Sequence, residues 1–188
     1  MKYLLLSPLL KNDSSYKGLM RWQPEHTEKE PEQTVWFNYA SQIDDFGFFS
    51  SFESVLKIYK DYIELGKEFE IIGCLNVTKC DKEEKTKTSF PLTFLGYDIN
   101  NQNGHSLLNE FGYTGHYNPE IIFLDKNVFR ELSLSYFSDR LNENRLLSNY
   151  IDARNLLMVE QEIITIDESL NFLHSEEYFI YKIFKVHV

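Results

Sequence analysis

The chain has 188 residues and a mass of 22.3 kDa, which is the usual size of a single domain. Apolar residues make up 43% of it and aromatic residues 15%, and this composition excludes a disordered chain. The formal net charge is −10, which argues against a protein that grips nucleic-acid phosphates through a basic surface. We therefore expect one acidic domain spanning 1–188, with no nucleic acid as its partner.

The N-terminal segment is apolar from Tyr3 to Leu6 and is interrupted by Pro8. The run is too short for a membrane span, which needs about 20 apolar residues. No cleavage site of small residues follows it, as a signal peptide would require. We predict a first strand here, a cytoplasmic protein and no membrane partner. Residues 11–33 are polar and contain prolines, which predicts a long surface loop.

Two segments before residue 70 carry clear secondary-structure signals. Residues 35–39 are aromatic or β-branched at most positions and predict a short strand. Ser50 and Glu53 have the spacing of a capping box, and apolar residues recur at three-to-four spacing after them. This pattern predicts a helix from about 52 to 65 that ends at Gly66.

The middle of the chain alternates apolar runs with polar connections. Residues 70–77 predict a buried strand, and the charged run 79–87 predicts a solvated, hairpin-like connection to a strand at 90–99. We predict two short strands within 105–125. Residues 128–141 fit a strand and a helix equally well.

The last forty residues predict a helix followed by a strand. Asn149 stands three residues before Asp152, which predicts a helix from Tyr150 to about 161. A short helical turn is expected at 167–173, and residues 178–188 predict a long strand. Strands mixed with separated helices indicate the α+β class: a mostly antiparallel sheet with two or three helices.

Two segments within the chain have similar sequences. The seven residues Phe49–Val55 parallel Leu147–Ala153, because both place an apolar residue, polar capping residues and an aromatic residue before a helix. Shared capping physics explains the likeness, and a true duplication is the alternative.

Residues suited to chemistry are scattered. Cys74 and Cys80 do not have the spacing of a zinc finger, and no nearby residue completes a ligand set, so we interpret them as buried or idle thiols. Asp98, His105 and His116 share a turn-rich region, but their spacing matches no standard metal motif. No nucleophile elbow, phosphate-binding loop or dinucleotide fingerprint is present. We therefore expect no enzyme, no metal and no cofactor.

The negative charge is concentrated in the second half of the chain. Residues 1–94 carry a net charge of −3 and residues 95–188 carry −7, and no Lys or Arg occurs from Asn155 to Tyr181. A solvated helix face explains this window, and the alternative is an acidic patch that meets a basic partner. The candidate partner-binding residues are Glu160, Glu162, Asp167, Glu168, Phe172, Glu176, Glu177 and Tyr178. Phe172 and Tyr178 would supply desolvated anchors, although aromatic residues at strand spacing are also typical of a core.

Two segments carry a resemblance to a known family. The run 94–99, followed by 106–113, resembles a segment of the bacterial immunity proteins of polymorphic-toxin and contact-dependent growth inhibition systems. Residues 141–147, leading into the helix at Tyr150, are similar to another segment of these proteins, although a Gly commonly stands where this chain has Arg145. The resemblance covers a minority of the chain and brings no catalytic residues.

The resemblance implies a small protein of bacterial competition that binds and neutralises one cognate toxin without catalysis. A nuclease toxin would be basic in order to hold phosphates, and a net charge of −10 suits its inhibitor. We expect a monomer or a weak homodimer. Two alternatives stay open: an acidic nucleic-acid mimic that inhibits a host defence protein, and a small enzyme of unrecognised type.

Overall fold

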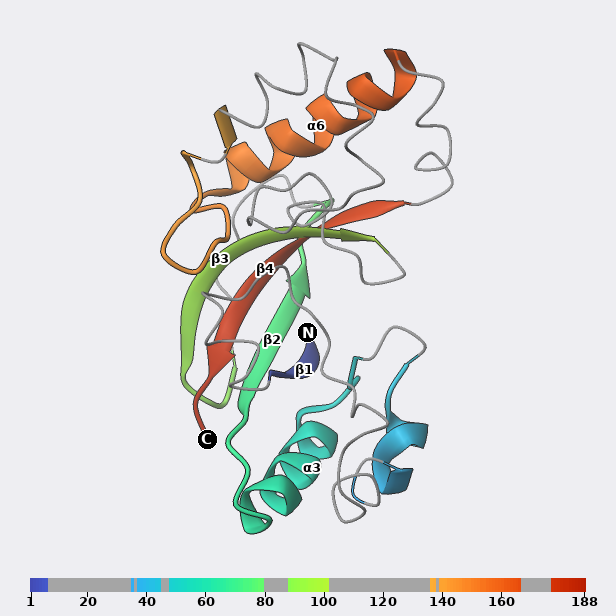
Figure 1. Ribbon diagram of the computed structural model, residues 1–188, viewed down its shortest axis with the longest axis vertical. Helices are drawn as coiled ribbons and strands as arrows, with labels where there is room; N and C mark the ends of the chain where they lie inside the picture. The colour runs from blue at the N-terminus through green and yellow to red at the C-terminus, as the bar shows by residue number, and fades with distance from the viewer. Residues whose placement is uncertain are drawn as a thin grey trace.

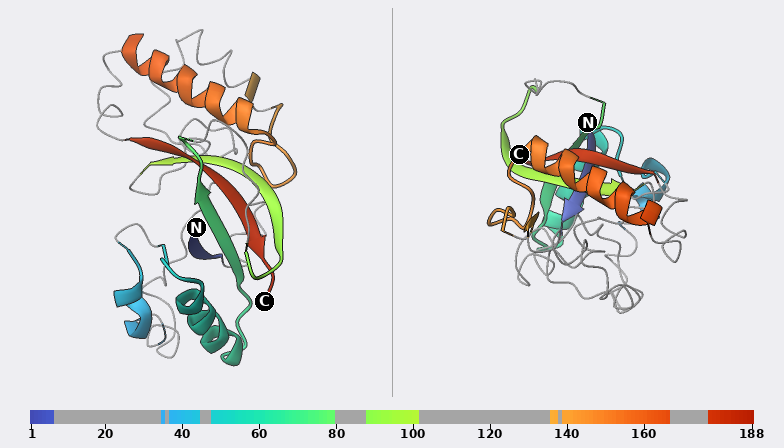
Figure 2. Two further views of the ribbon diagram at one scale, coloured as in Figure 1. Left: turned by 180° about the vertical axis from the view of Figure 1, so that it is seen from behind. Right: turned by 90° about the horizontal axis from the view of Figure 1, so that it is seen from above.

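The computed structural model describes residues 1–6, 35, 37–44, 48–79, 88–101, 136–137, 139–166 and 177–188. The elements in chain order are β1 (Lys2–Leu6), η1 (Ala40–Gln42), α3 (Phe52–Glu64), β2 (Glu70–Asn76), β3 (Leu92–Asn101), α6 (Tyr150–Ile166) and β4 (Tyr178–Val186). The four strands form one antiparallel sheet. With α3 at one end of this sheet and α6 at the other (Figures 1 and 2), the α+β class is confirmed.

The strand order is β1-β2-β4-β3, so the last strand of the chain lies in the middle of the sheet. The prediction of a hairpin-like connection between the strands at 70–77 and 90–99 is therefore wrong, because β4 separates β2 from β3. Residues 71–74 of β2 are all buried. A strand buried on both faces needs a neighbour on each side to satisfy its backbone, and β1 and β4 are those neighbours.

The predicted strand at 35–39 is also wrong. Residues 35 and 37–39 are helical and lead into η1. The Tyr39 hydroxyl donates a hydrogen bond of 2.8 Å to Asp61 Oδ2 in α3. Packing against α3 therefore outweighs the local preference of aromatic and β-branched residues for strands.

Both predicted helices are present. The N-cap of α3 is Ser51 rather than Ser50, because Ser51 Oγ accepts the hydrogen bond from Ser54 N at 3.1 Å. Gly66 ends the helix with a φ of +73°, as expected of a C-terminal glycine. The predicted cap of α6 at Asn149 is confirmed. This helix continues to Ile166, five residues beyond its predicted end at 161.

The two similar segments of the sequence, Phe49–Val55 and Leu147–Ala153, are bridged to the sheet in the same way. In each half, the residue two positions before the helix N-cap forms β-bridges with two residues. One of them lies six positions earlier in the chain, and the other is a tyrosine of the edge strand. The bridges are Ile43–Phe49 with Phe49–Tyr3, and Leu141–Leu147 with Leu147–Tyr97. Two backbone hydrogen bonds of 2.9 and 2.8 Å join Tyr3 to Phe49, and two of 2.8 and 3.0 Å join Tyr97 to Leu147.

The sheet register makes the two halves equivalent. Tyr3 of β1 lies opposite Gly73 of β2, and Tyr97 of β3 lies opposite Lys182 of β4. Gly73 and Lys182 therefore occupy equivalent positions. Each half consists of an edge strand, a bridged segment, a helix and an inner strand.

A pseudo-two-fold axis relates these halves. In the β2–β4 ladder, Cys74 pairs with Ile183, and this pair is flanked by Gly73–Phe184 and Leu75–Lys182. Replacing each residue by its equivalent in the other half converts the pair Gly73–Phe184 into Lys182–Leu75. The same exchange leaves the central pair, Cys74–Ile183, unchanged. The axis thus passes through the Cys74–Ile183 pair.

The helices pack on the same face of the sheet by the same kind of contact. The register places Tyr3 and Tyr97 on one face, because their partners Gly73 and Lys182 have the same orientation in the β2–β4 ladder. The Tyr3 ring lies 5.8 Å from Phe52, the first residue of α3, and the Tyr97 ring lies 5.9 Å from Tyr150, the first residue of α6. Aromatic contacts of this length add to the area that the rings bury.

Two core clusters follow from this arrangement. One joins α3 to β1 and to one end of β2 and β4, and includes Val55, Ile58 and Tyr62. The other joins α6 to β3 and the rest of the sheet, and includes Ala153 and Leu156. Cys74 is buried, as predicted. Among the described residues, no helix is both long enough and apolar enough to cross a bilayer.

Several predictions lie outside the described residues: the surface loop at 11–33, the strands within 105–125 and the helical turn at 167–173. Most of 79–87 and of 128–141, together with Cys80, also falls there.

Gly96→Ala tests the contact between β3 and the segment before α6. Gly96 has a φ of +145°, and an added Cβ would lie 2.5 Å from Leu146 Cβ and 3.0 Å from the Leu147 carbonyl oxygen. We expect a loss of about 3 kcal/mol in the free energy of unfolding, measured by urea titration. Gly66→Ala is the matched control, because its φ is +73° but no atom lies within 4 Å. It should cost only about 1 kcal/mol, and equal losses at both positions would contradict the close approach.

Tyr39→Phe tests the docking of residues 37–39 on α3. The hydrogen bond to Asp61, followed by burial and by the Asp61 charge, raises the pKa of Tyr39 above 10.0. Because the folded pKa is the higher one, the hydroxyl stabilises the protein fully below the unfolded pKa and loses its effect as pH rises through the folded pKa. Wild type should exceed Tyr39→Phe by about 1 kcal/mol near neutral pH, and the difference should shrink above pH 10. A difference independent of pH would contradict this role.

Candidate functional site

The segment before α6 is a tight hairpin, residues 141–147, that is tied to the edge of the sheet. Asn142 and Asn144 both donate side-chain hydrogen bonds to the Leu95 carbonyl, at 2.6 and 3.2 Å. Leu95 stands at a register shift in β3 between Phe94 and Gly96, which leaves its carbonyl free of the ladder. The two amides therefore satisfy a backbone acceptor that the bulge creates.

The loop of this hairpin contains a residue in a costly conformation. Arg145 has a φ of +57°, which is unusual for a residue other than glycine. Its N–H donates to the Asn142 carbonyl at 2.9 Å, and Asn142 N donates to the Leu146 carbonyl at 2.8 Å. A three-residue hairpin loop with its last residue left-handed is a common form, and glycine suits that position best. The geometry explains why glycine would be expected at position 145.

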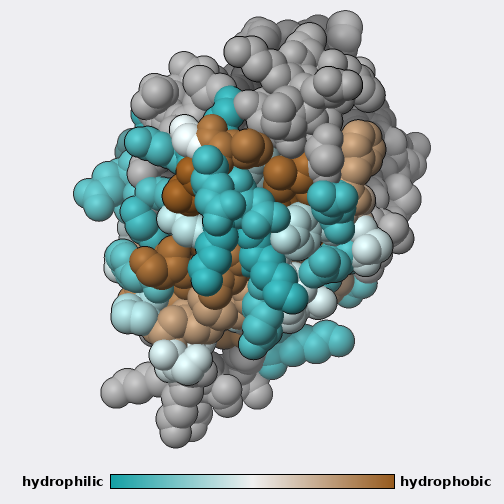
Figure 3. Space-filling model, turned by 90° about the horizontal axis from the view of Figure 1, so that it is seen from below, coloured by the Kyte–Doolittle hydropathy of each residue, from teal (hydrophilic) through white to brown (hydrophobic). Residues whose placement is uncertain are grey.

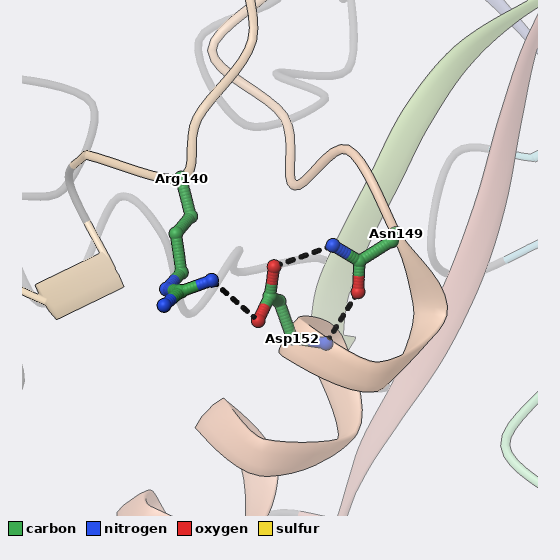
Figure 4. A network of polar contacts seen from close by, with 3 residues as sticks. All are labelled: Arg140, Asn149 and Asp152. Carbon is green, nitrogen blue, oxygen red and sulfur yellow. Dashed lines mark hydrogen bonds and ion pairs between the residues drawn. The ribbon is translucent and has the colours of Figure 1, made fainter.

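A polar network fixes the start of α6 (Figure 4). Asn149 Oδ1 accepts from Asp152 N at 2.9 Å, and Asn149 Nδ2 donates to Asp152 Oδ2 at 2.6 Å. Arg140 donates to Asp152 Oδ1 at 3.4 Å, and its guanidinium lies 3.8 Å from the centre of the Tyr136 ring. Asp152 is buried, so its charge is compensated by both neighbours. The network holds α6 in one orientation relative to the hairpin.

The solvent-facing side of α6 contains large apolar residues. Ile151 is 69% exposed and Met158 is 56% exposed, and Arg154 and Asn155 between them are also exposed. Spacings of three, four and seven residues place these side chains on one face of a helix. We call Ile151, Arg154, Asn155 and Met158 the α6 outer face.

The pseudo-two-fold supplies a comparison for this face. The residues of α3 at the equivalent positions are Glu53, Leu56, Lys57 and Lys60. Glu53, Lys57 and Lys60 are exposed and charged, where α6 has Ile151, Asn155 and Met158, and Leu56 is partly buried, where α6 has Arg154. Figure 3 shows the end of the molecule at which α3 lies, where hydrophilic residues form a band across the surface. Exposed apolar residues of α3 and the turn after it, Ile63 at 43% and Leu65 at 42%, lie at its C-terminal end. The fold therefore accommodates charges where α6 carries Ile151 and Met158.

The candidate partner-binding residues fall in three groups. Glu160 and Glu162 lie within α6, and their side chains are outside the described part of the chain. Asp167, Glu168, Phe172 and Glu176 lie outside the described residues altogether. Glu177 is exposed just before β4, whereas Tyr178 is 6% exposed and belongs to the core. Tyr178 is therefore a core residue, which was the alternative to a role as a binding anchor.

The buried polar residues of the sheet lie in the second half. Asp98 and Asn100 are buried on β3, where the equivalent part of β1 carries leucines. Asp98 Oδ1 accepts from Ile99 N at 2.9 Å, and its Oδ2 accepts from the Asn100 amide at 3.4 Å. His105 and His116 lie outside the described residues, and the residues that are described contain no group of three His, Cys, Asp or Glu suited to a metal ion.

Lys182 occupies the middle of the sheet among aromatic rings. Its Nζ lies 5.2 Å from the centre of the Phe94 ring, 5.7 Å from Phe184 and 6.0 Å from Tyr97. These distances allow cation–π attraction. The arrangement fills the position that Gly73 holds in the first half, and it joins β3 to β4.

Sequence reasoning missed Ile151 and Met158. Single exposed apolar residues are common on protein surfaces, so neither residue stands out alone. Aligning the two echoed segments position by position would have revealed the change from charged to apolar residues.

Comparison with known proteins adds no relative: no family model, no curated protein and no solved structure matches this chain.

Arg145→Gly tests the strain in the hairpin loop. Glycine adopts a positive φ without a Cβ clash, so we expect the free energy of unfolding to rise by about 0.5 to 1 kcal/mol. Arg145→Ala is the matched control, because it removes the side chain and keeps the strained backbone, and it should give no gain. Equal gains for the two variants in thermal or urea unfolding would show that the side chain, and not the backbone, carries the cost.

Proposed function

We propose that this protein is an immunity-type inhibitor that binds a basic toxin domain and blocks it without catalysis. The observation that carries the proposal is the α6 outer face, which has exposed Ile151 and Met158 where the equivalent helix has Glu53 and Lys60. Exposed apolar residues that the fold does not require are typical of a binding surface. Met and Arg are both enriched in protein–protein interfaces, and the α6 outer face contains one of each.

The charge of the chain supports a basic partner. The C-terminal part of α6 contains Glu160 and Glu162, and no Lys or Arg occurs between Asn155 and Tyr181. Complementary charge raises the association rate and rejects partners of like charge. A toxin domain that handles nucleic acid needs positive charge to bind phosphates, and it would therefore be attracted to this helix.

The α6 outer face favours an inhibitor over a nucleic-acid mimic. A mimic would present carboxylates in place of phosphates, whereas the exposed residues here include Ile151, Met158 and the cation Arg154. Apolar anchors with a charged surround are the usual composition of a protein–protein contact.

The direct test is co-expression with the product of the gene immediately upstream. The proposal predicts a one-to-one complex that survives size-exclusion chromatography, with at least about 1,200 Å² of buried surface, and rescue of cells that the upstream product would otherwise arrest. A harmless upstream product that does not bind would overturn the proposal.

Reversing charges in the acidic stretch tests the electrostatic part of the proposal. The variant Glu160→Lys/Glu162→Lys/Asp167→Lys/Glu168→Lys should slow association about tenfold or more at low salt, because like charges would then meet on approach. Stopped-flow measurement of the association rate against salt concentration is the readout.

The control reverses charges on the other helix. Glu53→Lys/Glu64→Lys adds positive charge to α3 and should change the rate far less, because α3 is not the proposed contact. Equal slowing by the two variants, after correction for the number of charges, would show that only net charge matters.

A further inference from the structure

We propose that α6 enters an apolar groove of the partner, with Ile151 and Met158 as its two anchors and Arg154 bonded to an acceptor between them. This inference rests on the proposed function and adds the mode of recognition and the chemistry of the partner surface. The occupant is one protein: the basic toxin domain, bearing a groove lined by apolar side chains.

The spacing of the anchors fits a helix bound in a groove. Ile151 and Met158 are seven residues apart, which is about 10.5 Å along a helix at 1.5 Å per residue. Anchors at i, i+3, i+4 and i+7 are the usual pattern of helix-in-groove recognition. Both anchors are more than half exposed, so each has apolar surface to bury on binding.

The anchors have no structural task that the fold demands. On the equivalent helix, the same positions are held by Glu53 and Lys60, and the buried positions behind them correspond closely: Val55 to Ala153 and Ile58 to Leu156, all buried. The two helices thus share these two buried positions and differ at the positions of the anchors. An exposed apolar residue in place of an exposed charge points to binding rather than folding.

The helix is held rigid before the partner arrives. The Asn149–Asp152–Arg140 network fixes its first turn, and the Tyr150 hydroxyl donates to the Val77 carbonyl at 3.3 Å. A surface that needs no ordering on binding loses less conformational entropy, which increases affinity. These contacts therefore favour α6 as a preformed ligand.

The charges along α6 define the partner surface. Arg154 lies between the anchors, so the groove needs a carboxylate or carbonyl there. Glu162 stands four residues after Met158 in the sequence, the spacing of neighbours on one helix face, so the partner surface beyond the second pocket needs Lys or Arg. The groove is thus apolar with an acceptor at its centre and cations at one end.

The test exchanges residues between the two helices. The variant Ile151→Glu/Met158→Lys gives α6 the residues that α3 carries at the equivalent positions, and it leaves the net charge of −10 unchanged. We expect its affinity for the product of the gene immediately upstream to fall about 30-fold or more, because both anchors are lost. Isothermal titration calorimetry gives the dissociation constant, and circular dichroism confirms that the variant is folded.

The reciprocal variant, Glu53→Ile/Lys60→Met, is the matched control. It places an equal apolar pair on α3 at unchanged net charge and should leave the affinity within about twofold of wild type. If the wild-type protein binds and the α6 variant binds equally well, the inference that α6 enters a groove of the partner is wrong, and the proposed function stands. If wild type does not bind, the proposed function fails and this inference fails with it.

The other possible occupant of the α6 outer face is a second copy of this chain. Light scattering of the protein alone tests for it. We expect wild type and the α6 variant to have the same mass as monomers at micromolar concentration. A wild-type dimer that the α6 variant converts to monomer would show that a second copy covers the α6 outer face, and it would overturn the inference.

Discussion

The antiparallel pairing of β2 with β4 is the interaction on which the rest of the structure depends. It joins an inner strand from each half of the chain, and both residues of its central pair, Cys74 and Ile183, are buried. Near one end of the ladder, Lys185 and Glu70 form an ion pair of 2.6 Å. Each edge strand pairs only with the inner strand of its own half. This one ladder therefore builds a single sheet from two smaller units and sets where the two helices lie.

The equivalence of the halves separates what the fold requires from what it permits. Both halves keep a tyrosine in the edge strand, a bridged residue before the N-cap and two buried positions in the helix. They differ where Gly73 corresponds to Lys182, and where the outer face of α3 is charged while that of α6 is partly apolar. The shared features account for packing and hydrogen bonding. The features that differ are the ones open to a function, and the α6 outer face is the one exposed to solvent.

Much of the fold follows from local signals in the sequence. The apolar run at 70–77, the caps before the two helices and the strand at 178–188 were predicted because each depends on neighbouring residues alone. The place of β4 between β2 and β3 was not predictable in this way, because strand order depends on contacts between residues more than a hundred positions apart. Residues 37–39 show the same limit, since their helical form depends on α3.

Less of the candidate site could be predicted from the sequence. The charge window overlaps the second half of α6, but the anchor residues inside it were chosen by aromatic character, and Tyr178 is in the core. Ile151 and Met158 gain significance only beside Glu53 and Lys60, and their exposure on the surface is known only from the structure. Similarly, the cost of Arg145 is visible only in its positive φ.

Hydroxyl-radical footprinting of the complex with the upstream gene product tests the central claim, that the protein binds its partner through α6. It needs no substitution, and Met158, one of the two proposed anchors, is a highly reactive probe. Oxidation of Met158 and Ile151 should fall about tenfold or more on binding, while that of Ile63 and Leu65 in the α3 region should be unchanged. Unchanged oxidation of Met158 in a stoichiometric complex would contradict the account, and protection of the α3 residues instead would assign binding to the other helix.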